Sequence, residues 1–271
     1  MGETQILGGL VAALATGRIR VVDLTQTLMP EFPAIVLPPE MGQCQPFRME
    51  QISAYDERGP GWYWNNFSCG EHTGTHFDAP IHWISGRDLP NNAVDTIPPQ
   101  DFVAPACVID CSQQTAANPD YLMTVADIEA FEAAHGRIPA QSWVLMRTDW
   151  SKRWARGHDG EAFQNLDETG QHTPGPSTEA VEFLVRQRDV LGFGSEAIGT
   201  DAGQGYHLRP PYPCHSLMHG AGKYGLQCLT NLDQLPPKGA VILSAPLKIQ
   251  KGSGSPLRVL ALVGDVMGDA A

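Results

Sequence analysis

The chain has 271 residues, of which 42% are hydrophobic and 18% are charged, so it is long enough to bury a sizeable core as one domain over residues 1–271. Its formal net charge of -12 argues against a nucleic-acid partner, because phosphate binding needs a clustered basic face that 18 scattered Lys and Arg residues do not supply. The six cysteines form no CxxC pair, which argues against a zinc ribbon or a disulfide scaffold and favours reduced thiols in the cytoplasm.

The first predicted element is a short amphipathic helix over residues 6–17, ILGGLVAALATG. This stretch has the length of the apolar part of a signal peptide, which is about 7–15 residues. However, Glu3 stands before it where basic residues would be needed, and the stretch is too short to span a bilayer. We therefore expect neither a signal peptide nor a membrane span in this segment.

Strands are predicted where short runs are rich in β-branched and other apolar residues. These runs cover residues 19–24, 106–111, 143–150, 189–200, 240–249 and 257–263. The last two runs follow one another along the chain and are expected to form a hairpin. Three long segments rich in Pro, Gly and polar residues, at 29–47, 153–176 and 203–214, are expected to be lids or pocket walls rather than simple connections.

Two helices are indicated by their capping residues. The first covers residues 124–136, with Thr124 as N-cap, Asp127 at the third helical position and Gly136 as a stop. The second covers residues 177–189 and starts from a serine cap. Because helices alternate with strands in the middle of the chain, we expect an α/β or mixed α+β domain with a mixed sheet at its core.

The stretch CGEHTGTHFDAPIHW, residues 69–83, concentrates three of the nine histidines: His72, His76 and His82. His-rich tracts of this kind are typical of metal binding. In an extended segment His76 and Asp78 point to the same side, and His72 can reach the same centre from the preceding turn. Two imidazoles and a carboxylate are a common ligand set for a divalent ion that keeps positions open for water or substrate. The glutamate of an HExxH metalloprotease helix is missing.

This stretch also resembles a known family. HTGTHFDAPIH is similar to the HxGTHxDxPxH signature of the cyclase superfamily, which are metal-dependent hydrolases that include bacterial kynurenine formamidases and isatin hydrolases. The resemblance continues through VVDLTQTL, VLMRTDW, GTDAG and the segment from LTNLDQLPPKG to the C-terminal strand, and GWYWNNFSCGEHTGTHFDAPIHW looks most like isatin hydrolases. It implies a swivelling β/β/α-type fold and a homo-oligomer, a dimer or tetramer, in which loops of one subunit close the pocket of its neighbour.

The resemblance also implies roles for individual residues. His72, His76 and Asp78 would hold the catalytic metal, and His82 would transfer the proton. Formamidases of this family hold a second metal with the bridging aspartate, a downstream histidine and a glutamate twelve residues after that histidine. Here His215 matches the histidine, but Gln227 stands at the glutamate position. Because a neutral amide removes one negative charge, we expect a single divalent ion, Mn²⁺ rather than Zn²⁺.

The expected activity is metal-dependent hydrolysis of a cyclic amide, with isatin opened to isatinate by water that the metal activates. Hydrolysis of N-formylkynurenine by an arylformamidase is an alternative, although Gln227 and the tryptophan-rich GWYWNNF count against it. A lactone hydrolase would use the same machinery. A non-catalytic metal-binding protein is the alternative from a different class, and loss of His82 or of a ligand would have indicated it.

Substrate contacts are predicted from residue types near the cluster. A flat aromatic substrate could stack on rings on both sides of it, and the alternative is that these rings are core; the residues are Trp62, Trp64, Phe67 and Trp83. His219 and Lys223 are candidates for polar contacts with the substrate or a second site, unless they lie on the surface. The remaining histidines in a helix end or in polar loops, His135, His158 and His172, are expected on the surface.

Overall fold

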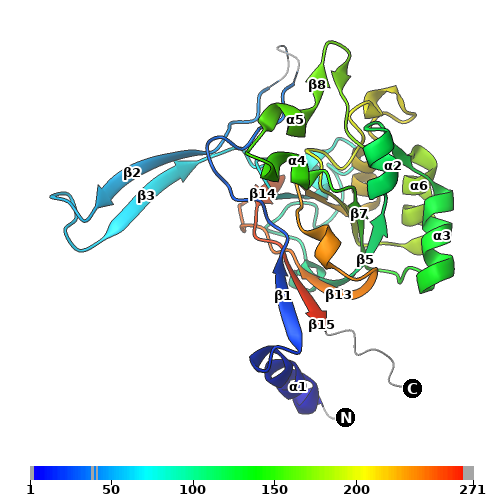
Figure 1. Cartoon of the computed structure of the whole chain (residues 1–271), viewed down its shortest axis with the longest axis horizontal. Helices are drawn as coiled ribbons and strands as arrows, with labels where there is room; N and C mark the ends of the chain where they lie inside the picture. The colour runs from blue at the N-terminus through cyan, green and yellow to red at the C-terminus, as the bar shows by residue number, and fades with distance from the viewer. Residues whose placement is uncertain (1–2, 38–39, 41, 265–271) are drawn as a thin grey trace.

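The computed structural model describes residues 3–37, 40 and 42–264 and is built around a nine-stranded mixed sheet (Figure 1). The strand order is β1-β15-β13-β5-β7-β11-β12-β4-β14. The four strands β5, β7, β11 and β12 are parallel, and the strands on either side of them pair antiparallel. The expected mixed α+β fold with a mixed sheet is therefore confirmed.

The strands of this sheet have the bounds β1 Ile19–Asp23, β4 His76–Asp78, β5 Val103–Asp110, β7 Trp143–Arg147, β11 Gly192–Ser195, β12 Tyr224–Gln227, β13 Lys238–Leu243, β14 Gly254–Pro256 and β15 Leu260–Gly264. Three two-stranded ribbons complete the strands: β2 Arg48–Ala54 with β3 Tyr63–Ser68, β6 Leu122–Met123 with β10 Gly175–Pro176, and β8 Leu166–Asp167 with β9 Gly170–Gln171. The α-helices are α1 Glu3–Ala15, α2 Ser112–Ala117, α3 Val125–His135, α4 Ser151–Ala155, α5 Gly160–Gln164 and α6 Thr178–Phe183.

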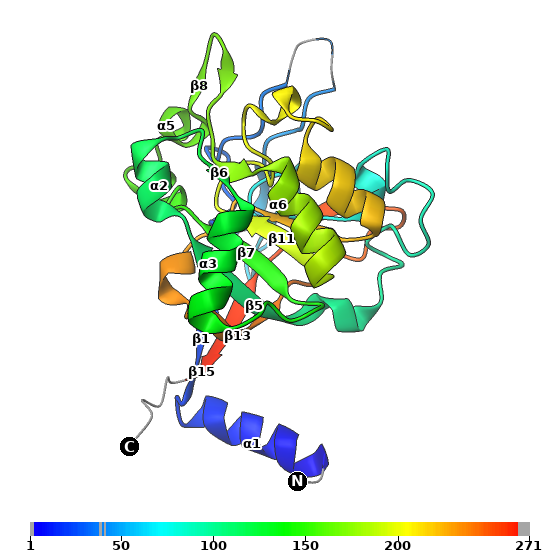
Figure 2. The same cartoon turned by 90° about the vertical axis from the view of Figure 1, so that its right-hand side faces the viewer.

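Helices α3 and α6 cover one face of the parallel strands (Figure 2). Both begin where the sequence predicts: Thr124 and Asp127 form a reciprocal capping box, and the Ser177 side chain accepts a hydrogen bond from the backbone of the second helix. Successive residues of β7 point to opposite faces, so Val144 packs beneath these helices while Leu145 packs in the core on the other side. The central strands are therefore buried on both faces, as parallel strands usually are.

Several predicted strands end earlier in the structure than in the sequence analysis. The run 143–150 leaves the sheet after Arg147, the run 189–200 forms only four strand residues, and the run 240–249 ends at Leu243. The prediction that the last two strands follow one another directly as a hairpin is wrong. Strands β13 and β15 do pair antiparallel, but the chain between them crosses to the far edge of the sheet, where β14 pairs with β4.

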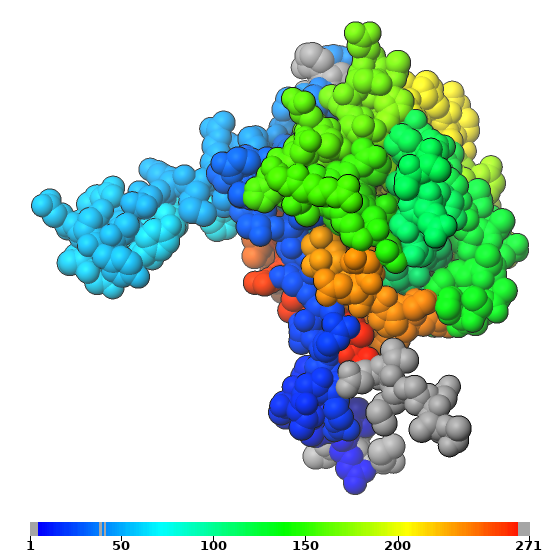
Figure 3. Space-filling model, viewed as in Figure 1, coloured from blue at the N-terminus to red at the C-terminus, as the bar shows by residue number. Residues whose placement is uncertain are grey.

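Two elements stand away from the body of the molecule. The ribbon β2–β3 forms a long projecting arm, and helix α1 extends beyond the edge strand β1 (Figures 1 and 3). Helix α1 overlaps the segment 6–17 where a helix was expected, but it begins three residues earlier and ends two residues earlier. No helix among residues 3–37, 40 and 42–264 has both the length and the apolar character needed to cross a membrane.

Candidate active site

The histidine cluster is built on the short strand β4 and the segments on either side of it. Gly74 adopts a left-handed backbone with φ of 67°, which turns the chain from His72 into the strand. His76 and Asp78 are the two ends of β4 and point to the same side. After the extended residue Ala79, a 3-10 turn over Pro80–His82 (η1) brings His82 back toward the cluster. The local geometry expected from the spacing is therefore present.

Asp78 lies at the centre of the site and has no solvent exposure. Its Oδ1 atom is 2.8 Å from His72 Nδ1 and 3.4 Å from His76 Nε2. The ligand atoms of His72, Asp78 and His82 all lie within 4.8 Å of one another, and so do those of Asp78, His215 and His219, so either group could hold a metal ion against this carboxylate. Of the three expected ligands, His72 and Asp78 share one of these groups, whereas His76 contacts Asp78 but belongs to neither group.

A second group of side chains meets the other oxygen of the same carboxylate. The Gln227 side-chain amide, on β12 beside β4, donates a hydrogen bond to Asp78 Oδ2. His215 Nε2 lies 3.8 Å and His219 Nε2 lies 4.0 Å from that oxygen. Asp78 therefore stands between two sets of imidazoles, and Gln227 meets the oxygen that faces His215 and His219.

The protonation state of these rings suits a metal site. His76 Nδ1 bonds the Gly74 carbonyl at 2.8 Å and His219 Nδ1 bonds the Lys223 carbonyl at 3.0 Å, which leaves each Nε2 facing Asp78. Both Nε2 atoms are buried and have no hydrogen-bond partner in the described part of the chain. Burial lowers the pKa of His76 and of His219 to about 4, so both rings are neutral near pH 7. Neutral buried imidazole nitrogens aimed at a carboxylate fit a divalent cation.

His82 lies against the cluster, and one of its ring nitrogens is within 4.8 Å of a ligand atom of Asp78. Its ring stacks on His72 with centroids 3.9 Å apart and lies 5.5 Å from the ring of His215. Burial lowers the pKa of His82 to about 3, so its ring is neutral at pH 7. Trp83 packs beside the same group, with its ring 4.9 Å from that of His215.

Two carboxylates position the histidines, and neither was assigned a role from the sequence. Asp201 accepts a hydrogen bond from His215 Nδ1 at 2.6 Å, and although burial lowers the pKa of His215, this bond raises it overall. On the other side His72 Nε2 meets the Ser253 hydroxyl at 2.9 Å, and that hydroxyl donates to Glu71 at 2.6 Å. Asp201 lies in the GTDAG stretch and Glu71 directly precedes His72, so both were within segments that the resemblance had already marked.

Other predicted residues lie elsewhere. The ammonium of Lys223 pairs with Asp189 at 2.5 Å, so its backbone carbonyl rather than its side chain serves the site. Trp62, Trp64 and Phe67 are 52%, 53% and 64% exposed on the arm, neither in the core nor against the cluster of their own chain. The sequence analysis placed them near the cluster because they precede it, but β2–β3 pairing carries them outward.

The remaining histidines and one predicted loop can also be located. His172 bonds Asp120 at 2.7 Å and His158 stacks on Trp154 with centroids 4.8 Å apart, both away from the cluster. The loop 203–214 does reach the site, because Tyr212 packs against Trp83 with ring centroids 5.9 Å apart. This loop therefore forms part of the wall beside the histidines.

Comparison with known proteins identifies the family. Residues 22–202 match the family model described as putative cyclase. An isatin hydrolase of Roseibium aggregatum is 49% identical over 97% of this chain and 99% of that protein. Isatin hydrolase A from Ralstonia solanacearum is 66% identical, with a TM-score of 0.93 over 95% of this chain and 97% of that one. An isatin hydrolase bound to the product analogue thioisatinate is 49% identical, with a TM-score of 0.94 over 97% of this chain and 100% of that one. These matches confirm the resemblance seen in the sequence, and the chain belongs to the cyclase family.

Proposed function

We propose that this protein is a metal-dependent cyclic amidase that opens isatin to isatinate. The observation that carries the proposal is the buried carboxylate of Asp78 with His72 and His76 on one of its oxygens. The relatives named isatin hydrolase support the substrate, because they match nearly the whole chain. All six cysteines are free thiols, which supports a reducing cytoplasm as the location.

The site would hold one divalent cation on His72, His76 and Asp78, with Mn²⁺ preferred to Zn²⁺. Such a cation supplies an acidified water and a positive charge for the developing oxyanion. Gln227 supports a single ion, because its amide donor already occupies Asp78 Oδ2 and offers no negative charge to a second one.

His82 has the geometry and charge state of the proton-transfer residue. Its neutral ring is stacked on His72, which would hold the cation, and one of its nitrogens lies within 4.8 Å of ligand atoms of His72 and Asp78. It accepts the proton of the attacking water and delivers it to the ring nitrogen as the amide bond breaks. Because the amide is cyclic, the amine and the new carboxylate stay on one product molecule. Trp83 provides an apolar ring beside His215 against which a flat substrate can lie.

The arm formed by β2 and β3 supports a homo-oligomer. Trp62 and Trp64 are exposed on a ribbon that projects from the body, although large apolar rings are usually covered (Figure 3). We infer that a second copy, in a dimer or tetramer, covers them and that they help to close the partner's substrate pocket. Trp62→Ala with Trp64→Ala should lower the oligomeric mass measured by light scattering and raise KM for isatin. An unchanged mass and KM would contradict this assignment.

The substrate assignment is tested by supplying isatin and N-formylkynurenine separately and identifying the products by mass spectrometry. We expect isatinate from isatin at a rate well above formate release from N-formylkynurenine. The reverse preference would assign the site to an arylformamidase. Turnover of neither compound would reject both substrates while leaving the metal site to be tested by metal binding alone.

A further inference from the structure

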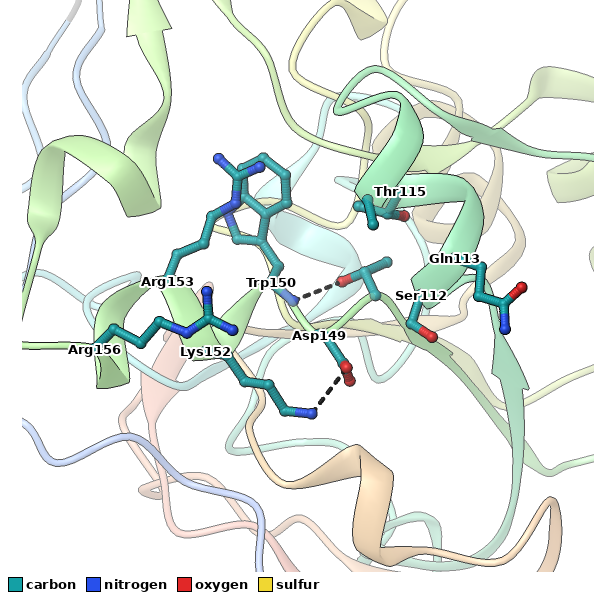
Figure 4. Close-up of a pocket in the computed structure, with 10 residues that line it drawn as sticks. Ser112, Gln113, Thr115, Asp149, Trp150, Lys152, Arg153 and Arg156 are labelled. Carbon is teal, nitrogen blue, oxygen red and sulfur yellow. Dashed lines mark hydrogen bonds and ion pairs between the residues drawn. The ribbon is translucent and has the colours of Figure 1, made fainter.

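A separate pocket of about 340 Å³ lies beyond the carboxyl ends of strands β5 and β7 (Figure 4). The chain segments that follow Asp110 and Arg147, where these strands end, form its walls together with helix α4. Ligands of open α/β sheets bind outside the carboxyl ends of the strands, and binding pockets have volumes of about 300–1,000 Å³. The position and size of this pocket are therefore those of a site for a small ligand.

The pocket is positively charged, although the chain as a whole carries a net charge of -12. Three cations line it, Lys152, Arg153 and Arg156, together with the carboxylate of Asp149. Asp149 is already engaged, since it pairs with Arg147 at 3.0 Å and with Lys152 at 2.8 Å. Lys152 also pairs with another carboxylate, that of Asp233, at 3.0 Å. The two arginines are thus left as the uncompensated charge of the pocket.

Arg153 and Arg156 face the pocket without an acidic partner. The Arg153 guanidinium lies 3.7 Å over the Trp150 ring, and its hydrogen bond goes to the neutral Ala162 carbonyl. Arg156 makes no ion pair or hydrogen bond from its side chain within residues 3–37, 40 and 42–264. Burial and the positive charge of Arg156 lower the pKa of Arg153, as expected where no anion lies nearby. Two neighbouring guanidiniums without a carboxylate are the arrangement that an oxyanion would complete.

The opposite wall offers neutral donors. Ser112, Gln113 and Thr115 of α2 lie across the pocket from the two arginines (Figure 4). A hydroxyl and a side-chain amide can donate to an oxygen that the guanidiniums hold. We propose that this pocket binds a small oxyanion, a phosphate or a carboxylate, between Arg153 and Arg156 on one wall and Ser112 and Gln113 on the other. This site is separate from the histidine cluster and does not depend on the proposed hydrolysis.

The test is isothermal titration calorimetry on the whole protein at low salt, with inorganic phosphate and, separately, benzoate. Two variants are measured, Arg156→Gln and the double variant that adds Arg153→Gln. Arg156 is exposed, so its replacement should not disturb folding. The control is Arg186→Gln, which replaces an exposed arginine in a different part of the chain. Each lost charged hydrogen bond should weaken binding by about tenfold or more. Tight binding of phosphate would assign a phosphate ligand, and tighter binding of benzoate would assign a carboxylate.

Two results would overturn this proposal. One is that neither phosphate nor benzoate binds to the wild-type protein. The other is that Arg156→Gln binds the anion as tightly as Arg186→Gln does. Binding at the histidine cluster would give the second result, because neither arginine contributes to that cluster. Thermal melts of each variant, compared with the wild type, verify that a loss of binding does not come from unfolding.

Discussion

Replacing Gln227 by glutamate would place a second carboxylate directly against Asp78. Gln227 is buried on β12, and its side-chain amide donates a hydrogen bond to Asp78 Oδ2. Asp78 itself has no solvent exposure. Two unit charges at 4 Å repel by about 4 kcal/mol at an effective dielectric constant of 20. The alternative is that the new glutamate becomes protonated. A glutamate has an ordinary pKa of about 4.3, and each pKa unit is worth about 1.36 kcal/mol, so protonation at pH 7 costs about as much free energy as the repulsion. Metal-free Gln227→Glu should therefore lose about 3–4 kcal/mol of stability.

A divalent cation should reverse this loss, because it compensates both carboxylates. The assay is urea unfolding of wild type, Gln227→Glu and the uncharged control Gln227→Met, each metal-free and with Mn²⁺ or Zn²⁺. We expect the glutamate variant to be the least stable without metal, to gain the most from metal, and to bind more than one ion per chain. Equal stability of the two variants without metal, or an equal gain on adding metal, would refute the assigned position of Gln227.

Three further changes test other parts of the structure. His82→Ala should keep metal binding while kcat falls by about 10²–10⁴-fold, and full activity would remove the proton-transfer role. The bond to Asp120 raises the pKa of His172, so its contribution to stability is complete below about pH 6.5 and lost as pH rises through the raised pKa. The melting temperature should therefore differ most between wild type and His172→Gln near pH 5.5, and a difference that grows toward pH 9 would contradict this sign. Thr124→Ala should cost about 1 kcal/mol in urea unfolding through loss of the capping box, and an unchanged midpoint would argue against that cap.

Features that depend on neighbouring residues could be predicted from the sequence. The alternation of a strand puts His76 and Asp78 on one side, and the caps of the helices that begin at Val125 and Thr178 involve side chains within three residues. These interactions need no knowledge of the rest of the fold. For the same reason the mixed sheet could be predicted from runs of apolar residues separated by capped helices.

Features that depend on distant segments could not be predicted in this way. Ser253 reaches His72 only because β14 pairs with β4, and Asp201 reaches His215 only because the segment after β11 packs against the helical segment Cys214–Met218. The arm residue Trp64 has the composition of a core or pocket residue, and only the pairing of β2 with β3 reveals that it is exposed. Hydrophobicity alone does not distinguish a buried core residue from an exposed one.

In the proposed function, one divalent ion held at Asp78 is required for the opening of isatin. The most direct test is to strip the protein with a chelator, add Mn²⁺ in steps, and follow isatin opening together with bound metal. We expect no turnover in the stripped protein and activity that rises until one ion is bound per chain. Asp78→Ala should be inactive and unable to hold the ion. Full turnover in the metal-free protein, or an active Asp78→Ala, would contradict this requirement.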